Sequence, residues 1–214
     1  MRIAHVSPFF EEVSVKSAGL NARGIAFLAE GLIRFGHDVT VFASGDSRVA
    51  GTLVPVSPLA LRHYPSPKRH LSEGLTFLAL EKAFSTAFPF DLIHVHAGFT
   101  AFPLMRRSPV PIVATVYDAL ELPEVVTLYR EFKELALVAT SPDQVRQCPE
   151  LNWQTLLPWN VPSQGEARAA EEFDSFVETA MAYTAVYDRV ITGAIGRRDP
   201  VRQTYSLQGA VSRM

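Results

Sequence analysis

The fold is decided by residues 21–44, which read NARGIAFLAEGLIRFGHDVTVFAS. Asn21 is a good helix N-cap, and apolar side chains recur at helical spacing over 25–33. Gly36 is expected to end this helix, and the β-branched run 38–44 follows it as a strand. A helix that passes within a few residues into a short apolar strand is typical of α/β proteins.

The same alternation of short apolar runs and longer helical segments extends along the chain. Further strands are expected at 2–7, 91–96, 111–117 and 135–140, with a weaker candidate at 154–158. A proline-rich and basic loop is expected at 58–70, followed by a helix at 71–88. Apolar strands joined by crossover helices indicate a parallel sheet that is covered on both faces. The predicted fold class is α/β, with a single doubly wound, Rossmann-like parallel sheet.

The end of the chain predicts a closing helix. Residues 1–162 are expected to form the domain, 163–196 a long amphipathic helix that packs on it, and 197–214 a mobile basic tail. The expected buried stripe of this helix consists of Phe173, Phe176, Met181, Tyr187 and Ile191. A stripe of that size would favour aggregation if it were exposed, so we expect it to be buried.

Composition narrows the classes of function. The 214 residues carry a formal net charge of −2, which does not suggest the clustered basic surface that nucleic acid requires. The single cysteine, Cys148, has no partner for an internal disulfide, and the N-terminus lacks the pattern of a signal peptide. No apolar run reaches the roughly 18 residues of a membrane-spanning helix. These features predict a cytoplasmic protein without a transmembrane segment.

The loop after the first strand is a candidate phosphate site. In a doubly wound sheet, ligands bind at the carboxyl ends of the strands, where helix N-termini offer free N–H groups to anions. The loop contains Lys16 and Gly19 and leads into the first helix. It lacks a complete GxGxxG or GxxxxGK[ST] pattern, so an ordinary loop with one turn glycine is the alternative.

Three histidines are expected near the same edge of the sheet. His94 and His96 lie on one side of a strand because side chains alternate with period two, and His5 belongs to an expected neighbouring strand. Such a group could bind a metal. Spacing fixes no third ligand, however, and strand-end histidines are more often hydrogen-bonded structural groups. We therefore predict no metal site and keep His94 as a candidate ligand contact.

A candidate general base follows the strand at 111–117. Tyr117 ends this strand and Asp118 follows it directly, where a base could contact a substrate. Carboxylates near the start of a helix are equally expected from the helix dipole, so Asp118 has a structural alternative. No Ser-His-Asp or Cys-His arrangement can be argued from the sequence.

Several separate motifs, taken together, resemble a known family. They are MRIAHVSPFF (1–10), GHDVTVFASGDS (36–47), DLIHVHAGF (91–99), FPLMRRSPVPIVATV (102–116), LELPE (120–124) and LNWQTLLPWNVP (151–162). Over about residues 1–162 the chain resembles the N-terminal half of bacterial GT-B glycosyltransferases of family 4. The resemblance implies two facing Rossmann-like domains, of which the first mainly holds the acceptor and the second holds most of the nucleotide-sugar donor.

The resemblance also implies that the donor domain is missing. The segment PWNVPSQGEARAAEEF (158–173) looks like a junction left by its removal, and the helix that follows looks like the family's terminal helix, which crosses back onto the first domain. The family's donor motif has two glutamates eight positions apart in the second domain. Glu73 and Glu81 have that spacing but lie on an expected helix of the first domain, so they are not donor ligands.

Two departures from the family pattern weaken the case for catalysis. The glycine pair of the first loop reads Gly19-Leu20, and the family's histidine after the fifth strand is Tyr117, with Asp118 in place of glycine. Leucine obstructs close backbone approach to a diphosphate, and tyrosine is a poor substitute for histidine in proton transfer near neutral pH.

The missing donor domain and these two departures favour a reduced glycosyltransferase-like domain that is inactive alone and serves as a binding or assembly module, without a cofactor. One alternative is the acceptor-binding subunit of a split glycosyltransferase that uses a nucleotide-sugar. In that case Lys16, Gly19, His94 and Asp118 would line the interdomain cleft. The other alternative is a nucleotide or sugar sensor.

Aromatic residues predict an interaction surface at the strand-end edge. Phe9, Phe10, Phe99 and Phe102 follow two of the expected strands, and Tyr117 follows a third. Without a second domain, these rings would form an exposed surface that a homodimer or a partner protein covers. The alternative is that the first loop folds over and buries them.

Overall fold

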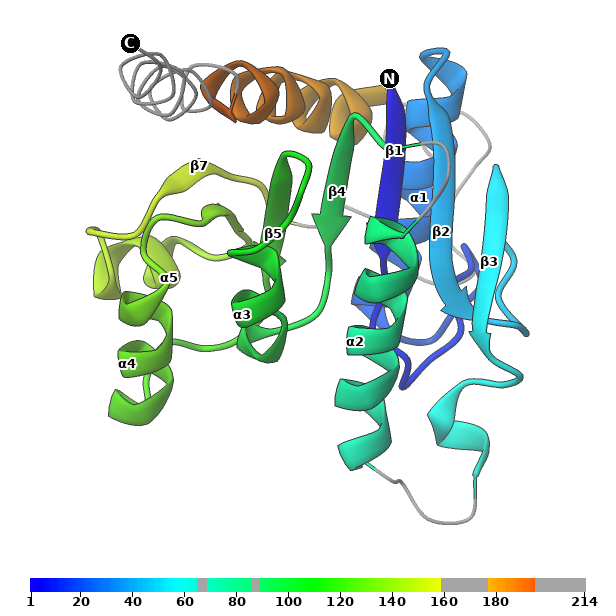
Figure 1. Cartoon of the computed structure of the whole chain (residues 1–214), viewed down its shortest axis with the longest axis horizontal. Helices are drawn as coiled ribbons and strands as arrows, with labels where there is room; N and C mark the ends of the chain where they lie inside the picture. The colour runs from blue at the N-terminus through cyan, green and yellow to red at the C-terminus, as the bar shows by residue number, and fades with distance from the viewer. Residues whose placement is uncertain (65–68, 86–88, 159–176, 195–214) are drawn as a thin grey trace, which may run out of the picture.

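The computed structural model describes residues 1–64, 69–85, 89–158 and 177–194. They form one seven-stranded sheet in which every pair of neighbouring strands is parallel (Figure 1). The strands are β1 (Arg2–Val6), β2 (Asp38–Ser44), β3 (Thr52–Ser57), β4 (Leu92–Val95), β5 (Ile112–Val116), β6 (Ala136–Ala139) and β7 (Trp153–Leu156). Their order is β3-β2-β1-β4-β5-β6-β7, so the direction of winding reverses between β1 and β4. The predicted doubly wound sheet is confirmed.

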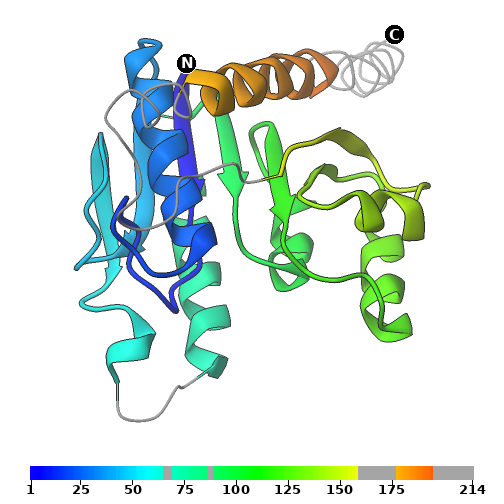
Figure 2. The ribbon, with the colours of Figure 1, turned by 180° about the vertical axis from the view of Figure 1, so that it is seen from behind.

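Helices cover both faces of the sheet. They are α1 (Leu20–Arg34), α2 (Arg69–Phe84), α3 (Phe102–Met105), α4 (Pro123–Glu131) and α5 (Pro142–Gln147), with 3-10 turns η1 (Leu61–His63) and η2 (Phe99–Ala101). Side chains of α2, α3 and α4 belong to one hydrophobic core cluster. Those of α1 and of a helix over 177–194 belong to the second cluster. Figure 2 shows α1 on the face opposite to α2, so the sheet separates two cores.

Local sequence signals explain several helix ends. Gly36 has a φ of 79°, the left-handed conformation that glycine tolerates, and it ends α1 as expected. Ser141 and Gln144 form a capping box at the start of α5, where Ser141 accepts from the backbone N–H of Asp143. The amide nitrogen of Gln144 also donates to the carbonyl oxygens of Val116 and Asp118. The start of α5 therefore fixes the chain just after β5.

Two expected elements need correction. Helix α1 begins at Leu20, and its N-cap is Gly19 without a side-chain cap, so the expected start at Asn21 is wrong. Strand β3 was not predicted, because Pro55 interrupts its apolar pattern. Proline is tolerated there because β3 lies at the edge of the sheet, where a missing N–H disrupts no second ladder.

The C-terminal helix (177–194) crosses the sheet on the side where the strands begin (orange in Figure 1). Its packing against the domain was predicted, and Tyr187 is completely buried while Ile191 is partly buried. Met181 is 59% exposed, so its place in the stripe is wrong. Phe173 and Phe176 lie outside the described residues, as does the expected tail.

The buried stripe contains Tyr183 in place of Met181. Tyr183 is completely buried because its hydroxyl finds a hydrogen-bond partner, the Thr115 hydroxyl, at 2.9 Å. The stripe is therefore rotated relative to the one that hydrophobicity alone predicts. No helix within the described ranges is long and apolar enough to span a membrane.

Candidate functional site

A cavity of about 220 Å³ lies at the carboxyl ends of β1, β4 and β5. This is the point where strand order reverses, which is where doubly wound sheets bind ligands. The lining residues come from α1, α2 and the loops after the three strands: Pro8, Asn21, Ser72, Glu73, Thr76, His96, Ala97, Gly98, Thr100 and Tyr117. Hydroxyl, amide and carboxylate groups therefore converge on one small space.

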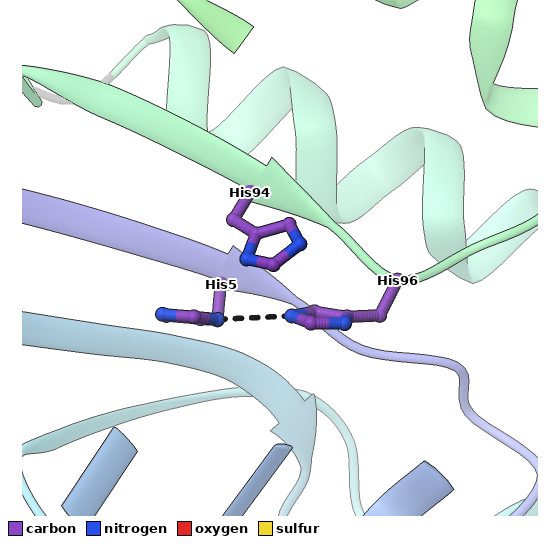
Figure 3. Close-up of side chains that lie close together, drawn as sticks. All are labelled: His5, His94 and His96. Carbon is purple, nitrogen blue, oxygen red and sulfur yellow. Dashed lines mark hydrogen bonds between the residues drawn. The ribbon is translucent and has the colours of Figure 1, made fainter. Parts of the chain in front are cut away.

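A hydrogen-bonded chain connects this cavity to the interior of the sheet. Tyr117 Oη lies 2.8 Å from Nδ1 of His96, and Nε2 of His96 lies 3.0 Å from Nδ1 of His5. Figure 3 shows His5 projecting from β1, His94 from β4, and His96 just beyond the end of β4. The expected placement of His5 beside His94 is confirmed, because the two residues are paired across β1 and β4.

The three histidines are neutral near pH 7. Burial lowers the pKa of His5 to about 3. Burial also lowers the pKa of His94 and His96 well below the usual value, and the charges of the neighbouring histidines add to the effect. Each ring therefore offers one N–H donor and one acceptor nitrogen.

The hydrogen-bond partners indicate which residue donates in the His5–His96 bond and in the His96–Tyr117 bond. Nε2 of His5 is buried and has no partner among the described residues. An orphaned N–H is rarer in protein interiors than an orphaned acceptor, so the proton of His5 belongs on Nδ1. His5 then donates to Nε2 of His96, and Nδ1 of His96 donates to Tyr117. The hydroxyl proton of Tyr117 consequently points away from His96.

We expect two-bond proton–nitrogen correlation spectra of the folded protein to show both His5 and His96 protonated at Nδ1. The physical reason is that only this pair of tautomers leaves no N–H of the two rings buried without a partner. In His5→Gln, the His96 pattern should change, whereas His63→Gln, at an exposed position, should leave it unchanged. A His5 ring protonated at Nε2 would contradict the proposed donation from His5 to His96.

His94 holds the C-terminal helix and does not line the cavity. Its Nδ1 lies 2.8 Å from the Tyr187 hydroxyl, and its Nε2 lies 2.8 Å from the Thr115 hydroxyl. The side chain is completely buried. The structure thus places this predicted ligand contact inside the core, where its two nitrogens join the helix to β4 and β5.

The histidine cluster has metal-like spacing, since one nitrogen from each ring lies within 4.8 Å of the others. The facing nitrogens of His5 and His96 already share a hydrogen bond, and both nitrogens of His94 bond to hydroxyls. A metal ion would have to replace these bonds. The arrangement therefore fits the structural interpretation of these histidines better than the metal interpretation.

The first loop brings a carboxylate to the start of α1. The Oε2 atom of Glu11 lies against Gly19, so close that a Cβ at this position would collide with it. A negative charge is favourable at a helix N-terminus. Lys16 is exposed, and its backbone N–H bonds to the Ser14 hydroxyl. The space beside Gly19, a candidate for phosphate, is thus occupied by a side chain of the protein.

Asp118 packs beside the cavity and is not among its lining residues. Its Oδ2 atom accepts a hydrogen bond of 2.7 Å from the hydroxyl of the buried Tyr129. Burial and the Asp118 carboxylate raise the pKa of Tyr129. The same oxygen lies 2.9 Å from where a Cβ on Gly98 would be. These contacts tie α4 to the loops after β4 and β5, which is a structural role.

The predicted aromatic surface is only partly present. Phe9 and Phe102 are buried in the core, so their expected exposure is wrong, whereas Phe10 is 47% exposed and Phe99 is partly buried. The backbone carbonyls of Phe9 and Phe10 accept hydrogen bonds from the N–H groups of Leu61 and Arg62. These bonds tie the first loop to η1, so that Phe9 turns inward.

Sequence reasoning identified Tyr117 but missed most of the cavity. Asn21 was singled out only as a cap, and Ser72, Thr76 and Thr100 were not singled out. The pair Ser72 and Thr76, four residues apart on one helix face, is a signal that could have been used. Thr100 offers no such signal, because it lies in the short 3-10 turn η2 after β4, which has no helical periodicity.

Residues 22–145 match the family model of glycosyltransferase family 4. Because this match spans more than half of the chain, the chain belongs to that family. The fold agrees with a GT-B glycosyltransferase domain of the N-terminal type. A search of curated proteins finds no match.

Two solved structures that are similar to this chain are compared with it by identity, coverage and TM-score. Sucrose-phosphate synthase from Thermosynechococcus elongatus is 14% identical, with 88% of this chain and 98% of that chain covered and a TM-score of 0.52. A glycosyltransferase involved in avilamycin A biosynthesis, AviGT4, is 15% identical, with 79% of this chain covered and a TM-score of 0.45. The matched region spans 45% of that second chain. At these identities the first likeness shows the fold alone.

Proposed function

We propose that this chain is a family 4 glycosyltransferase-like module that binds a sugar in the strand-end cavity and does not transfer sugars by itself. The observation that carries the proposal is the short connection between β7 and the C-terminal helix. Only residues 157–176 lie between Leu156 and the described helix. A domain requires about 50–250 residues, so a donor-binding domain does not fit at this position.

The chemistry of the cavity also supports binding over transfer. His96 is the imidazole that lines the cavity in the described part of the chain. Burial keeps it neutral, and its two nitrogens bond to His5 and Tyr117. The Asp118 carboxylate is engaged by Tyr129. Neither group is placed for proton transfer to a ligand in the cavity, whereas the hydroxyl and amide groups of the lining suit the hydroxyls of a sugar.

The test combines a turnover assay with a binding assay on the full-length chain. We expect no sugar transfer and no hydrolysis from a panel of nucleotide-sugars, together with saturable binding of at least one free sugar. Tyr117→Phe should weaken that binding about tenfold and should also cost about 1–3 kcal/mol of stability, because Nδ1 of His96 loses its partner. Binding is therefore measured at a temperature where the variant is folded. Met181→Ala, on the exposed side of the C-terminal helix, should leave binding unchanged. Turnover without any partner would falsify the proposal.

The second candidate function is the acceptor-side subunit of a split glycosyltransferase. It is favoured by exposed apolar side chains in the first loop and at the start of α1: Phe10, Val15 and Leu20 are each more than 40% exposed. They would lie under a partner protein or a second copy of the chain. A monomer by light scattering at micromolar concentration, with no partner co-purifying in the native form, counts against it.

A further inference from the structure

We propose that Glu12, Asp46 and His63 form a binding site for a divalent metal ion, and that Zn²⁺ is the ion that fits it best. None of these three residues is among the residues that line the strand-end cavity. The site is also separate from the histidine cluster of β1 and β4, and the sequence did not point to it. The inference goes beyond the proposed function and does not depend on sugar binding.

The three side chains follow the carboxyl ends of three adjacent strands. Glu12 lies in the first loop, which follows β1, Asp46 lies in the turn after β2, and His63 belongs to η1, which follows β3. The order β3-β2-β1 makes these strand ends neighbours. Each side chain therefore brings one potential ligand atom to the same place, and the three atoms lie within 4.8 Å of one another.

The distances between these atoms are close to those around a zinc ion. Nε2 of His63 lies 3.6 Å from Oδ2 of Asp46 and 3.9 Å from Oε2 of Glu12. With metal–ligand bonds of about 2.0–2.2 Å, the ligand atoms of a tetrahedral zinc site are about 3.4 Å apart. Both observed distances are too long for hydrogen bonds. Small movements of the side chains would therefore close the three atoms around an ion.

The carboxylate of Glu12 gives a second reason for a cation at this place. Its Oε1 atom accepts a hydrogen bond of 2.6 Å from Nη2 of Arg62. Its Oε2 atom is buried and accepts no hydrogen bond from the described part of the chain. A buried carboxylate oxygen without a partner is costly, and this oxygen is the one that faces His63. A metal ion bound there would satisfy it.

The protonation of His63 in this arrangement suits a metal ligand. Its Nε2 atom accepts a long hydrogen bond of 3.4 Å from Nε of Arg62, so this nitrogen carries a lone pair and no proton. Metal ions bind imidazole in this deprotonated form. Zn²⁺ would take the place of the Arg62 bond at His63, while Nη2 of Arg62 can keep its bond to Oε1 of Glu12.

The backbone around the site is held in place by the protein itself. The N–H of Val13 donates to the Ser47 hydroxyl at 2.9 Å, which ties the first loop to the turn after β2. The N–H of Ala60, directly before η1, donates to both carboxylate oxygens of Asp46 at 3.1 Å. A carboxylate has about four acceptor positions, so Asp46 can bond to this N–H and to a metal ion together. Metal binding therefore requires little ordering of the chain.

The ligand types select the ion. Mg²⁺ and Ca²⁺ prefer oxygen ligands, whereas imidazole suits Zn²⁺. For a given set of nitrogen and oxygen ligands, affinity is lower for Mn²⁺ than for Zn²⁺. The two carboxylates together balance the double charge of the ion. We therefore expect Zn²⁺ to bind more tightly than Mn²⁺ and Mg²⁺.

The experiment titrates the untagged full-length chain, freed of metal by a chelator, with Zn²⁺ alone in a calorimeter. We expect saturable binding of one Zn²⁺ per chain, and binding of Mn²⁺ that is at least tenfold weaker. His63→Gln and Asp46→Asn should each weaken Zn²⁺ binding at least tenfold. The matched control His37→Gln removes a partly exposed imidazole just before β2, at the opposite edge of the sheet, and should leave the affinity unchanged.

Two-bond proton–nitrogen correlation spectra of the unmodified chain locate the ion without relying on the folding of a variant. Zn²⁺ should shift the Nε2 signal of His63 and leave the signals of His5 and His96 unchanged. Shifts at His5 and His96 in place of His63 would overturn the inference. The same holds if saturable binding is absent, if only His37→Gln reduces it, or if His63→Gln and Asp46→Asn leave it unchanged. None of these outcomes bears on sugar binding, so the proposed function is tested separately.

Discussion

A chain shortened to residues 1–162 is expected to lose cooperative folding. The removed helix buries Tyr183, Val186 and Tyr187 completely. At about 1.5–3 kcal/mol for each large side chain, their burial contributes roughly 5–9 kcal/mol, which is comparable to the whole stability of about 5–15 kcal/mol of a typical domain. Thermal unfolding followed by near-ultraviolet circular dichroism should show no sharp transition, and the protein should aggregate or resemble a molten globule.

Point variants in the full-length chain separate the contribution of the helix from a general effect of truncation. Tyr187→Phe leaves Nδ1 of His94 without its partner and should cost about 1–3 kcal/mol. Tyr183→Phe should cost less, because the Thr115 hydroxyl keeps its bond to His94. Met181→Ala should stay within about 0.5 kcal/mol. A 1–162 fragment that melts cooperatively would show that the helix is dispensable.

The protein is also expected to lose stability steeply between pH 6.5 and 5. The pKa of His5 is about 3 in the folded state, against an ordinary value of 6.5, and the pKa values of His94 and His96 are lowered in the same direction. Below pH 6.5 the unfolded chain therefore binds protons that the folded chain does not. Stability is complete above pH 6.5 and falls as the pH falls, by up to about 1.4 kcal/mol per histidine and pH unit.

For three such histidines together, we expect the free energy of unfolding at pH 5.5 to be about 4 kcal/mol lower than at neutral pH. Urea denaturation at a series of pH values measures it. His5→Gln should reduce the slope of stability against pH by about a third, while the exposed His63→Gln should preserve it. His37, whose pKa is also lowered, adds a smaller term of the same sign. A constant free energy of unfolding from pH 7 to 5 would contradict the neutral, buried state of the cluster.

Carboxylates do not obscure this pH window. The pKa values of Asp46, Glu134 and Glu150 are lowered by hydrogen bonds and neighbouring cations, so their stabilisation is present above their ordinary values and is lost only at more acidic pH. The interval from pH 6.5 to 5 therefore reports mainly on the histidines.

Much of the fold was predictable because strands that are buried in a sheet consist of short apolar runs, which can be recognised in the sequence. The expected run 38–44 coincides with β2, and each of the other expected strands overlaps an observed one. Periodicity identifies which side of an element is apolar, but it does not identify the partner of a polar atom. Tyr183 illustrates the difference, since its burial depends on a hydroxyl partner, Thr115, 68 residues away.

The candidate site was less predictable for the same reason. The edge of the sheet follows from topology, so Tyr117 was placed correctly beside a cavity. The positions of Glu11 and Asp118 depend on loop conformations and on Gly19 and Gly98, which sequence patterns do not specify. The inward turn of Phe9 likewise depends on backbone bonds to η1, which follows a strand that was not predicted.

The hydrogen bond between His94 and Tyr187 joins residues 93 positions apart and constrains the order of folding. At a synthesis rate of about 5–20 residues per second, His94 leaves the site of synthesis roughly 5–20 s before its partner exists. During this interval the C-terminal helix cannot cover the His94 ring or the apolar side chains of β4 and β5 that share its core cluster, Leu92 and Val113. Long-range contacts of this kind form late, so this part of the nascent sheet stays exposed until the helix has been synthesised.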